Sequence, residues 1–307
     1  MSAILDTPVV GTAQELDATR LHGEAARLHD ADGMEDAEER ARARRERVDR
    51  TARWLMPALT LSTGLIIWQG LVMWNEIPPY LVPGPWLVAQ TLWADAGLLW
   101  ADLQQTMSLT ILALLVAVIG GVGIAILFTQ SKRVEQSFGP YAVVLQVTPV
   151  IAIAPLIRIY VDTPTAQLLL CAWIIAFFPI LSNTTLGLKS VDHNLRDLFH
   201  IYGATRWQRL RHLQLPAALP YFLGGLRIAG GLALIGAVVA EFVIGVGGTA
   251  YGIAARILES SYRLNMPRLF AALVVTALAG VAIYVVTGWI SHMALRKWHE
   301  SAVKREA

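Results

Sequence analysis

The chain has a single cysteine, few charged residues and long stretches without any basic residue. Cys171 is the only cysteine among 307 residues, so no disulfide can form within the chain. Charged residues make up 16% of the sequence, against about 25% in a typical soluble domain. Lysine and arginine are absent from the whole of residues 54–131. With a hydrophobic content of 55%, this distribution predicts an integral membrane protein.

Motifs for catalysis and nucleotide binding are also missing. No Gly-x-x-x-x-Gly-Lys-Ser/Thr loop occurs, and the nearest resemblance, residues 187–190, lacks the Gly-Lys pair. No serine lies in a Gly-x-Ser-x-Gly turn, and the acidic residues within apolar stretches are too few to hold a metal ion. We therefore expect no catalytic residue, metal or cofactor in this chain, and its net charge of +2 gives no indication of nucleic-acid binding.

Six stretches are long and apolar enough to form membrane spans. A helix needs roughly 20 apolar residues to cross about 30 Å of hydrocarbon, and unpaired backbone groups are excluded there. The six stretches are residues 54–74, 107–128, 137–157, 165–188, 220–244 and 269–295. We predict an all-α integral membrane fold with about six transmembrane helices, in which residues 51–307 form the membrane domain.

The distribution of basic residues predicts the orientation. They gather before the first stretch and after the second, fourth and sixth, whereas residues 75–106 contain none. The positive-inside rule then places both termini and the loop at 189–219 in the cytoplasm of a multi-pass cell-membrane protein. Arg256, Arg263 and Arg268 lie outside in this count, against the rule, and a helix lying at the surface over Tyr251–Tyr262 would accommodate them.

The loop before the fifth stretch carries the most specific pattern. Residues 197–220 read DLFHIYGATRWQRLRHLQLPAALP, a basic, helix-compatible segment that is followed by prolines. It resembles the cytoplasmic "EAA" loop of permease subunits of ATP-binding-cassette (ABC) importers. The acidic position is Asp197 and the glycine position is Gly203, while Leu213, Leu215 and Pro216 complete the spacing. Leu198 and Phe199 replace the two alanines of the family pattern.

The resemblance extends from about residue 146 to residue 298, to permeases of the nitrate/sulfonate/taurine/pyrimidine-type importers. It rests on three further motifs: the proline-punctuated run 146–156, the run 178–187 with Phe-Pro-Ile, and the run 220–242 with Gly-Leu-Arg-Ile-Ala. It implies a type I importer-like permease with a cytoplasmic coupling helix. It also implies a second copy of the chain in a homodimer, two cytoplasmic ATPases that bind ATP and Mg²⁺, and an extracytoplasmic solute-binding protein.

In this interpretation the loop at 190–219 transmits closure of the ATPases to the spans. We expect one helix from Asn194 to Gln214 that fits a groove on the ATPase, where small residues allow close approach and arginines meet acidic rims. Pro216 and Pro220 would end that helix. The candidate coupling residues are Asp197, Gly203, Ala204, Arg206, Arg209, Leu213, Leu215 and Pro216.

Polar residues within the spans are candidates for the translocation path. They are Gln146, Pro149, Arg158, Asn183, Arg227 and Glu241. Arg227 is either a gate or anchor or a residue that extends to the headgroups, and Glu241 either pairs with Arg256 or lines the solute path. Arg158 either offers a bidentate contact to a carboxylate or sulfonate or pairs with Asp162.

The predicted function is the permease subunit of an ATP-driven importer for a small, anionic solute. Two alternatives stay open: a secondary carrier driven by an ion gradient, and a membrane scaffold that transports nothing. No internal repeat supports the carrier. Residues 1–50 form a polar cytoplasmic extension, which is either a solvated helix or a regulatory contact with the ATPase. They lack the apolar core of a cleavable signal peptide.

Overall fold

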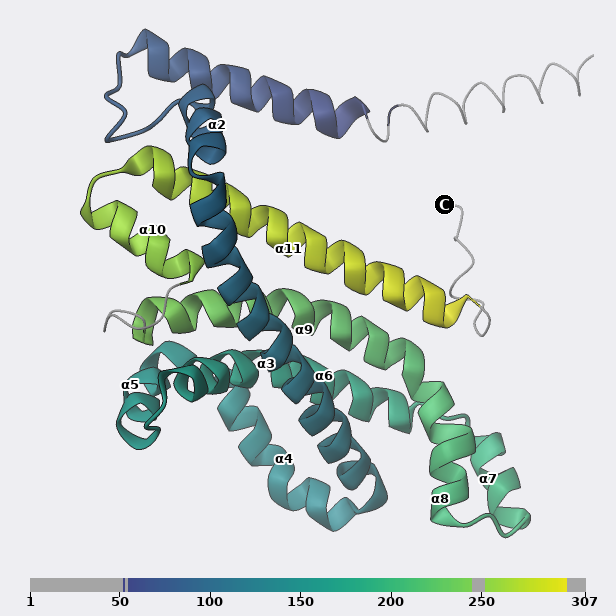
Figure 1. The fold of residues 1–307 in the computed structure, drawn as a ribbon. Helices are drawn as coiled ribbons and strands as arrows, with labels where there is room; N and C mark the ends of the chain where they lie inside the picture. The colour runs from purple at the N-terminus through teal and green to yellow at the C-terminus, as the bar shows by residue number, and fades with distance from the viewer. Residues whose placement is uncertain (1–51, 53–54, 245–251, 297–307) are drawn as a thin grey trace, which may run out of the picture. The chain divides into compact units, whose positions relative to one another are not determined.

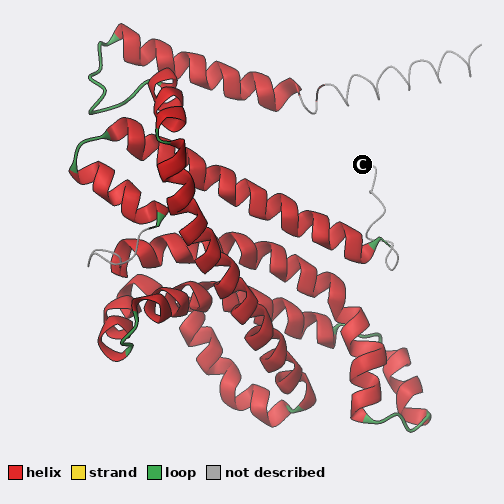
Figure 2. Ribbon diagram, in the orientation of Figure 1, coloured by secondary structure: helices red, strands yellow, loops and turns green. Residues whose placement is uncertain are grey.

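The computed structural model describes residue 52 and residues 55–244 and 252–296, and every regular element among them is a helix (Figures 1 and 2). The predicted extension at 1–50 lies outside these residues. The chain divides into two compact units, residues 1–70 and residues 71–307. Most of the first long apolar helix, Leu55–Trp74, belongs to the first unit.

The second unit holds the helices labelled α2 to α11 in Figure 1 and one short turn of π-helix. They are α2 (Pro85–Ala94), α3 (Ala96–Gln130), α4 (Lys132–Val147), α5 (Val150–Tyr160), α6 (Pro164–Lys189), α7 (His193–Ile201), α8 (Arg206–Arg209), the π-helical turn η1 (Leu210–Gln214), α9 (Leu215–Ile244), α10 (Ile253–Tyr262) and α11 (Met266–Leu295). In the described part of the chain, five helices are long and apolar enough to cross a membrane, or six if the bent pair α4–α5 counts as one span.

The third predicted span is not the continuous helix that its composition suggested. α4 and α5 meet at Thr148 and Pro149 with a bend of 104°. Both residues have extended backbone, and for Thr148 the reason is that the ring of Pro149 disfavours helical backbone in the residue before it. Pro140 and Pro155 stay inside helices, so the break occurs at one proline of three.

The bent pair nevertheless runs from one side of the membrane domain to the other. Lys189 at the end of α6 forms an ion pair with Glu135 in the first turn of α4, so these two helix ends lie together. α5 ends at Tyr160, shortly before α6 begins at Pro164. Since α6 is long enough to cross, α4 and α5 together connect the same two sides, which supports the predicted six crossings.

The core lies between α6 and α9, which pack closely through small residues. A Cβ atom on Gly236 of α9 would lie 2.9 Å from the Cα atom of Ala172 in α6. Gly187 of α6 faces Ala218 of α9 in the same way, at 2.8 Å. Small residues allow helix backbones to approach each other closely in a membrane. Close packing matters there because lipid is as apolar as the helix surfaces, so the hydrophobic effect does not drive the helices together. Cys171 is fully buried in this core.

The helix that begins at Arg206 continues to Ile244, although it contains Pro216 and Pro220. The prediction that these prolines end the helix is therefore wrong. A proline clashes with the carbonyl four residues earlier. Here the backbone N–H of Leu215 bonds to the carbonyl of Leu210, five residues earlier, so the wider turn of η1 adjusts the helix just before Pro216.

Candidate functional site

The predicted coupling helix over Asn194–Gln214 is instead a pair of helices joined by a tight turn. α7 ends at Ile201, and Gly203 follows with a φ of +64°. This left-handed conformation ends a helix and favours glycine. Thr205 then begins α8 with a capping box, in which its side chain and that of Gln208 each bond the other residue's backbone N–H. The single-helix prediction is wrong because these two signals stop one helix and start the next.

The environment of Gly203 shows why glycine is required there. A Cβ atom at this position would have no atom within 4 Å in this chain, so space does not select glycine. The positive φ does, because a Cβ atom in that conformation approaches the following carbonyl. The close approach to a partner that the sequence suggested for Gly203 and Ala204 stays a prediction.

Apolar side chains are exposed on the turn between α7 and α8. Ile201 is 80% exposed, Tyr202 81% and Trp207 66%. A cleft of about 400 Å³ lies between the two helices, and its lining includes Phe199 and Ala204. We call the exposed residues Leu198, Ile201, Tyr202 and Trp207 the apolar elbow. Large apolar side chains exposed together on one turn make it a candidate interaction site.

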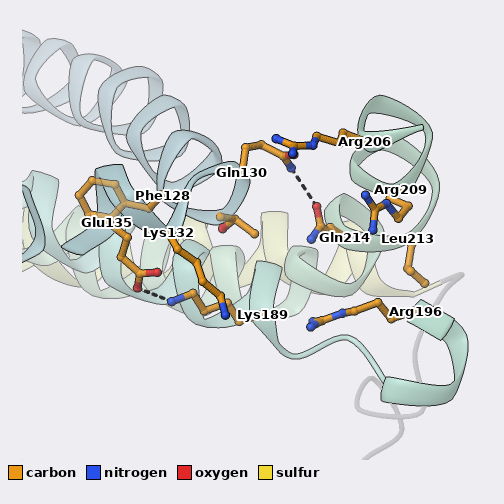
Figure 3. A pocket seen from close by; sticks show the side chains of 11 residues that line it. Phe128, Gln130, Lys132, Glu135, Lys189, Arg196, Arg206, Arg209, Leu213 and Gln214 are labelled. Carbon is orange, nitrogen blue, oxygen red and sulfur yellow. Dashed lines mark hydrogen bonds and ion pairs between the residues drawn. The ribbon is translucent and has the colours of Figure 1, made fainter. Parts of the chain in front are cut away.

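We call residues 190–219 the coupling segment. A second cleft, of about 500 Å³, separates this segment from the ends of α3, α4 and α6 (Figure 3). We call it the basic cleft, and its charged lining consists of Lys132, Glu135, Lys189, Arg196, Arg206 and Arg209. The amide of Gln130, at the end of α3, donates a hydrogen bond of 3.1 Å to the side-chain oxygen of Gln214 in η1. This bond ties the membrane domain to the coupling segment.

Four of the eight predicted coupling residues line one of these two clefts. Arg206, Arg209 and Leu213 line the basic cleft, whereas Ala204 lines the cleft beside the apolar elbow. Asp197 is exposed on α7. Leu215 packs against the hydrophobic core and Pro216 is half-buried beside it. The arginines thus lie near the membrane domain, a placement that the sequence pattern alone did not indicate.

Glu241 lies buried at the opposite end of α9 and holds the start of α10. Its carboxylate accepts a hydrogen bond of 2.7 Å from the hydroxyl of Thr106 and one of 3.0 Å from the backbone N–H of Ala254. The Thr106 oxygen accepts from the backbone N–H of Ile253 at 2.9 Å. Helix N-termini have unpaired N–H groups that favour a carboxylate. Gly252 packs against this carboxylate, where a Cβ atom would lie 2.2 Å from an oxygen.

The predicted ion pair between Glu241 and Arg256 is wrong. Arg256 instead binds Asp102 of α3, with 2.7 Å between Nε and Oδ2, and Glu259 of its own helix. The hydrogen bond that Arg256 donates to the carboxylate of Asp102 raises the pKa of Arg256 above its ordinary value, so this guanidinium stays charged. Arg268 binds Asp95 at 2.6 Å, a second pairing of this kind.

Ion pairs of this kind make the three arginines near α10 compatible with the orientation predicted from the positive-inside rule. Figure 1 shows α10 at the end of the long helices that lies away from α7 and α8. The third arginine, Arg263, pairs with Glu259 at 3.0 Å. Each guanidinium therefore has a carboxylate partner, which offsets its positive charge on that side. The predicted helix over Tyr251–Tyr262 is present as α10 from Ile253.

Gln146 and Pro149 line a third cleft, of about 430 Å³, at the bend between α4 and α5. Its other walls come from α6 and α9 and are apolar: Ile174, Ile175, Phe178, Pro179, Leu232 and Val239. None of the residues lining it is charged. Asn183 is not among them, and its amide donates a 2.8 Å hydrogen bond to the carbonyl of Pro179 within α6.

The two remaining arginines of the predicted path lie on exposed surfaces. Arg158 is exposed in the last turn of α5, and its predicted ion pair with Asp162 does not form in the described structure, because the chain leaves the helix at Val161 with extended backbone. The guanidinium of Arg227 lies 3.8 Å from the ring centre of Tyr284, which joins α9 to α11. This contact supports an anchor, and the gate stays a prediction.

Sequence reasoning missed several residues that matter for these sites. Thr106 and Gly252 give no signal of their own, because a threonine in an apolar helix and a glycine in a loop are common. Asp102 could have been found, since it is one of only three acids in residues 75–106 and needs a basic partner. Lys132 and Arg196 were read only as contributors to orientation.

Residues 117–297 match the family described as "Binding-protein-dependent transport system inner membrane component". The chain belongs to this family. It is 36% identical over 261 residues to the riboflavin transport system permease protein RibX of Chloroflexus aurantiacus, covering 83% of this chain and 96% of that protein. It is 32% identical to the formylaminopyrimidine transport permease protein ThiX of Halalkalibacterium halodurans, covering 74% and 89%.

The fold agrees with the family. The structure resembles a chain of an amino acid ABC transporter with a TM-score of 0.55 and 18% identity, covering 68% of this chain and 97% of that one. Relatives named for nitrate, sulfonate and taurine transport confirm the predicted group. The protein is thus the permease subunit of an ABC importer for a small solute, in the inner membrane, and not a secondary carrier or a scaffold.

Proposed function

We propose that this permease works as a homodimer with two separate ATPase subunits and an extracytoplasmic binding protein. ATP and Mg²⁺ bind to the ATPases and not to this chain. The family description, with its dependence on a binding protein, supports the last partner. The exposed apolar elbow supports the ATPases, because apolar side chains of this size are covered by a partner when they lie outside a membrane.

The orientation proposed is that α7 and α8 face the cytoplasm together with both termini, while α10 lies on the opposite side. Lys132, Lys189 and the arginines of the coupling segment support this side as cytoplasmic by the positive-inside rule. The three arginines near α10 are paired with carboxylates and do not outweigh it. The extension at 1–50 then also lies in the cytoplasm, before the permease domain at 51–307.

Coupling is proposed to occur through the apolar elbow. Its side chains dock on the ATPase, and Gly203 sets the angle between α7 and α8 that presents them together. α8 continues without interruption through η1 into α9. A displacement of the docked elbow is therefore passed directly to the membrane helix that packs against α6. Asp197 and Arg211 are exposed on the same segment and are the charged residues proposed to meet the ATPase around the elbow.

Changing Ile201 to aspartate tests this proposal. Ile201→Asp places a charge in the centre of the apolar elbow, and we expect the ATPase to be lost on co-purification while the permease stays inserted. Asn194→Asp is the matched control, because it adds the same charge at the start of α7, where a helix N-terminus tolerates it. Equal ATPase retention in the two variants would refute docking through the elbow.

For the solute, we propose an uncharged heteroaromatic compound that passes the cleft at the α4–α5 bend. The lining of the cleft supports this class, since Gln146 and Thr148 offer hydrogen bonds and the other walls are apolar. The relatives named for riboflavin and formylaminopyrimidine support it as well. An anionic solute is the second candidate, favoured by the exposed guanidinium of Arg158 and by relatives named for nitrate and sulfonates.

Two variants distinguish these candidates. Uptake of riboflavin, formylaminopyrimidine, taurine and nitrate is measured in vesicles that hold the permease with its ATPase and binding protein. For a heteroaromatic solute, Gln146→Ala lowers uptake about tenfold through the loss of hydrogen bonds, while Arg158→Gln transports normally. The reverse result would favour the anionic solute.

A further inference from the structure

The basic cleft concentrates positive charge without enough negative charge to balance it. Five cationic side chains line it, Lys132, Lys189, Arg196, Arg206 and Arg209, against the single carboxylate of Glu135. That carboxylate pairs with Lys189. In the described part of the chain, none of the other four cations forms an ion pair. Arg196 and Arg209 are also partly buried.

Cations that converge in this way repel one another unless an anion lies among them. The arginines come from α7 and α8, whereas the lysines come from the ends of α4 and α6, so the charges converge from both walls (Figure 3). The guanidinium group presents a planar fork of donors that matches phosphate oxygens, and ammonium groups complete such a site as point charges. The ligand chemistry that fits best is therefore a phosphate group.

The position of the cleft indicates the source of that phosphate. α3 ends at Gln130, α4 begins at Lys132 and α6 ends at Lys189, so the cleft lies where three membrane helices leave the hydrocarbon. Phe128 and Leu213 add apolar surface to its lining. A basic pocket at the cytoplasmic ends of membrane helices is suited to anionic lipid headgroups, which gather at this depth.

We propose that the basic cleft binds the phosphate of an anionic phospholipid headgroup, and so bridges the membrane domain and the coupling segment. The headgroup joins Lys132 and Lys189 on one wall to the three arginines of α7 and α8 on the other. It acts beside the hydrogen bond between Gln130 and Gln214, the direct side-chain link across the same gap. The choice of an anionic phospholipid rests on the proposed orientation, and its effect on coupling rests on the proposed function, whereas binding to the purified chain is measured without either.

Thermal unfolding of the purified full chain tests the binding without any partner. The permease is stripped of lipid in neutral detergent, and its midpoint is followed by tryptophan fluorescence. Phosphatidylglycerol, phosphatidylcholine and inorganic phosphate are each added to saturation. We expect phosphatidylglycerol to raise the midpoint, because a ligand bound only to the folded state stabilises it. The other two additions leave it unchanged.

Charge variants locate the site. Arg196→Gln with Arg209→Gln should weaken the phosphatidylglycerol response about tenfold or more, since each removed guanidinium takes away charge-assisted hydrogen bonds. The matched control is Arg133→Gln with Arg296→Gln, an equal loss of charge at exposed residues that do not line the cleft. Lys132→Gln, at an exposed helix end, supplies a second cleft variant if the arginine pair does not fold.

Each alternative result overturns the proposal. An equal response to inorganic phosphate would make this a site for free phosphate. An equal weakening in the control would indicate general attraction to a charged surface. No response to phosphatidylglycerol, with ATPase co-purification lost in the cleft variants, would assign the cleft to acidic side chains of the ATPase. The elbow variant Ile201→Asp should bind phosphatidylglycerol normally, so failure of docking and failure of lipid binding are separate results.

Discussion

Glu241 is a buried carboxylate that is stabilised by hydrogen bonds and not by a basic partner. Its oxygens accept hydrogen bonds from Thr106 of α3 and from the backbone of Ala254 in α10. A buried charge is stable only when such groups replace water. Glu241 therefore anchors α10 and joins α3, α9 and α10, and it lines none of the three clefts described above.

Removing the hydroxyl of Thr106 should show how much these hydrogen bonds contribute to the free energy of unfolding. Thr106→Val keeps the side-chain shape but leaves Oε1 of Glu241 and the backbone N–H of Ile253 each without a hydrogen-bond partner, while the bond from Ala254 to Oε2 remains. We expect a loss of about 1–3 kcal/mol in the free energy of unfolding. Ser108→Ala is the control, because its hydroxyl bonds only to its own helix at an exposed position. A Thr106 variant as stable as this control would contradict the anchoring role.

Gly203 shows a residue whose conformation, and not its size, is required. Gly203→Ala should weaken the turn by about 1–2 kcal/mol, because φ is positive there, and so lower solute-stimulated ATP hydrolysis in the assembled importer. Gly203→Asn should retain more activity, since asparagine adopts this conformation more readily. Equal activity of the alanine and asparagine variants would show that φ is not the limiting property.

At the scale of helices, the contact between α6 and α9 depends on glycines that face the partner helix. Gly236→Val should destabilise the fold by about 1–3 kcal/mol, because the added atoms would overlap Ala172. Gly231→Val is a strict control on the same helix, where an added Cβ atom meets nothing within 4 Å. The amount of monodisperse protein after extraction measures both, and equal yields would argue against close α6–α9 packing.

Among the helices, some features can be predicted from the sequence and others cannot. The long apolar runs predict α3, α6, α9 and α11, because hydrocarbon leaves the backbone no alternative to a helix. The breaks are less predictable. Pro149 interrupts a helix while Pro155, Pro216 and Pro220 are accommodated inside helices, and the surrounding packing decides between these outcomes.

The candidate sites show the same division. The spacing of Gly203 and the Leu-Pro pair predicted a docking loop in the segment that holds α7 and α8, because this pattern depends on residues close in sequence, and its coupling role stays a prediction. The basic cleft and the Glu241 network depend on side chains far apart in sequence, such as Gln130 with Gln214 and Thr106 with Glu241. Local patterns carry no record of such pairs, and the predicted partner of Arg256 was wrong for this reason. The predicted partner of Arg158 was wrong because α5 ends before Asp162.

For the whole molecule, the single buried cysteine offers a direct test of orientation. Cys171 is 0% exposed, so a membrane-impermeant maleimide should give little background labelling. Arg263→Cys, beyond α10, should be labelled in intact cells, whereas His193→Cys, at the start of α7, should be labelled only after the membrane is opened. Labelling of His193→Cys in intact cells would reverse the proposed topology.

The uninterrupted helix from Arg206 to Ile244 makes the two ends of the molecule mechanically dependent on each other. Its 39 residues form a lever about 58 Å long, at 1.5 Å per residue. One end carries Trp207 of the apolar elbow. The other end carries the carboxylate of Glu241, which accepts a hydrogen bond from the first turn of α10. A tilt of this lever about its close contact with α6 would swing the two ends in opposite directions. A partner that moves the apolar elbow would then open or close the membrane domain at the α10 end, although no ligand passes between the two ends of the lever.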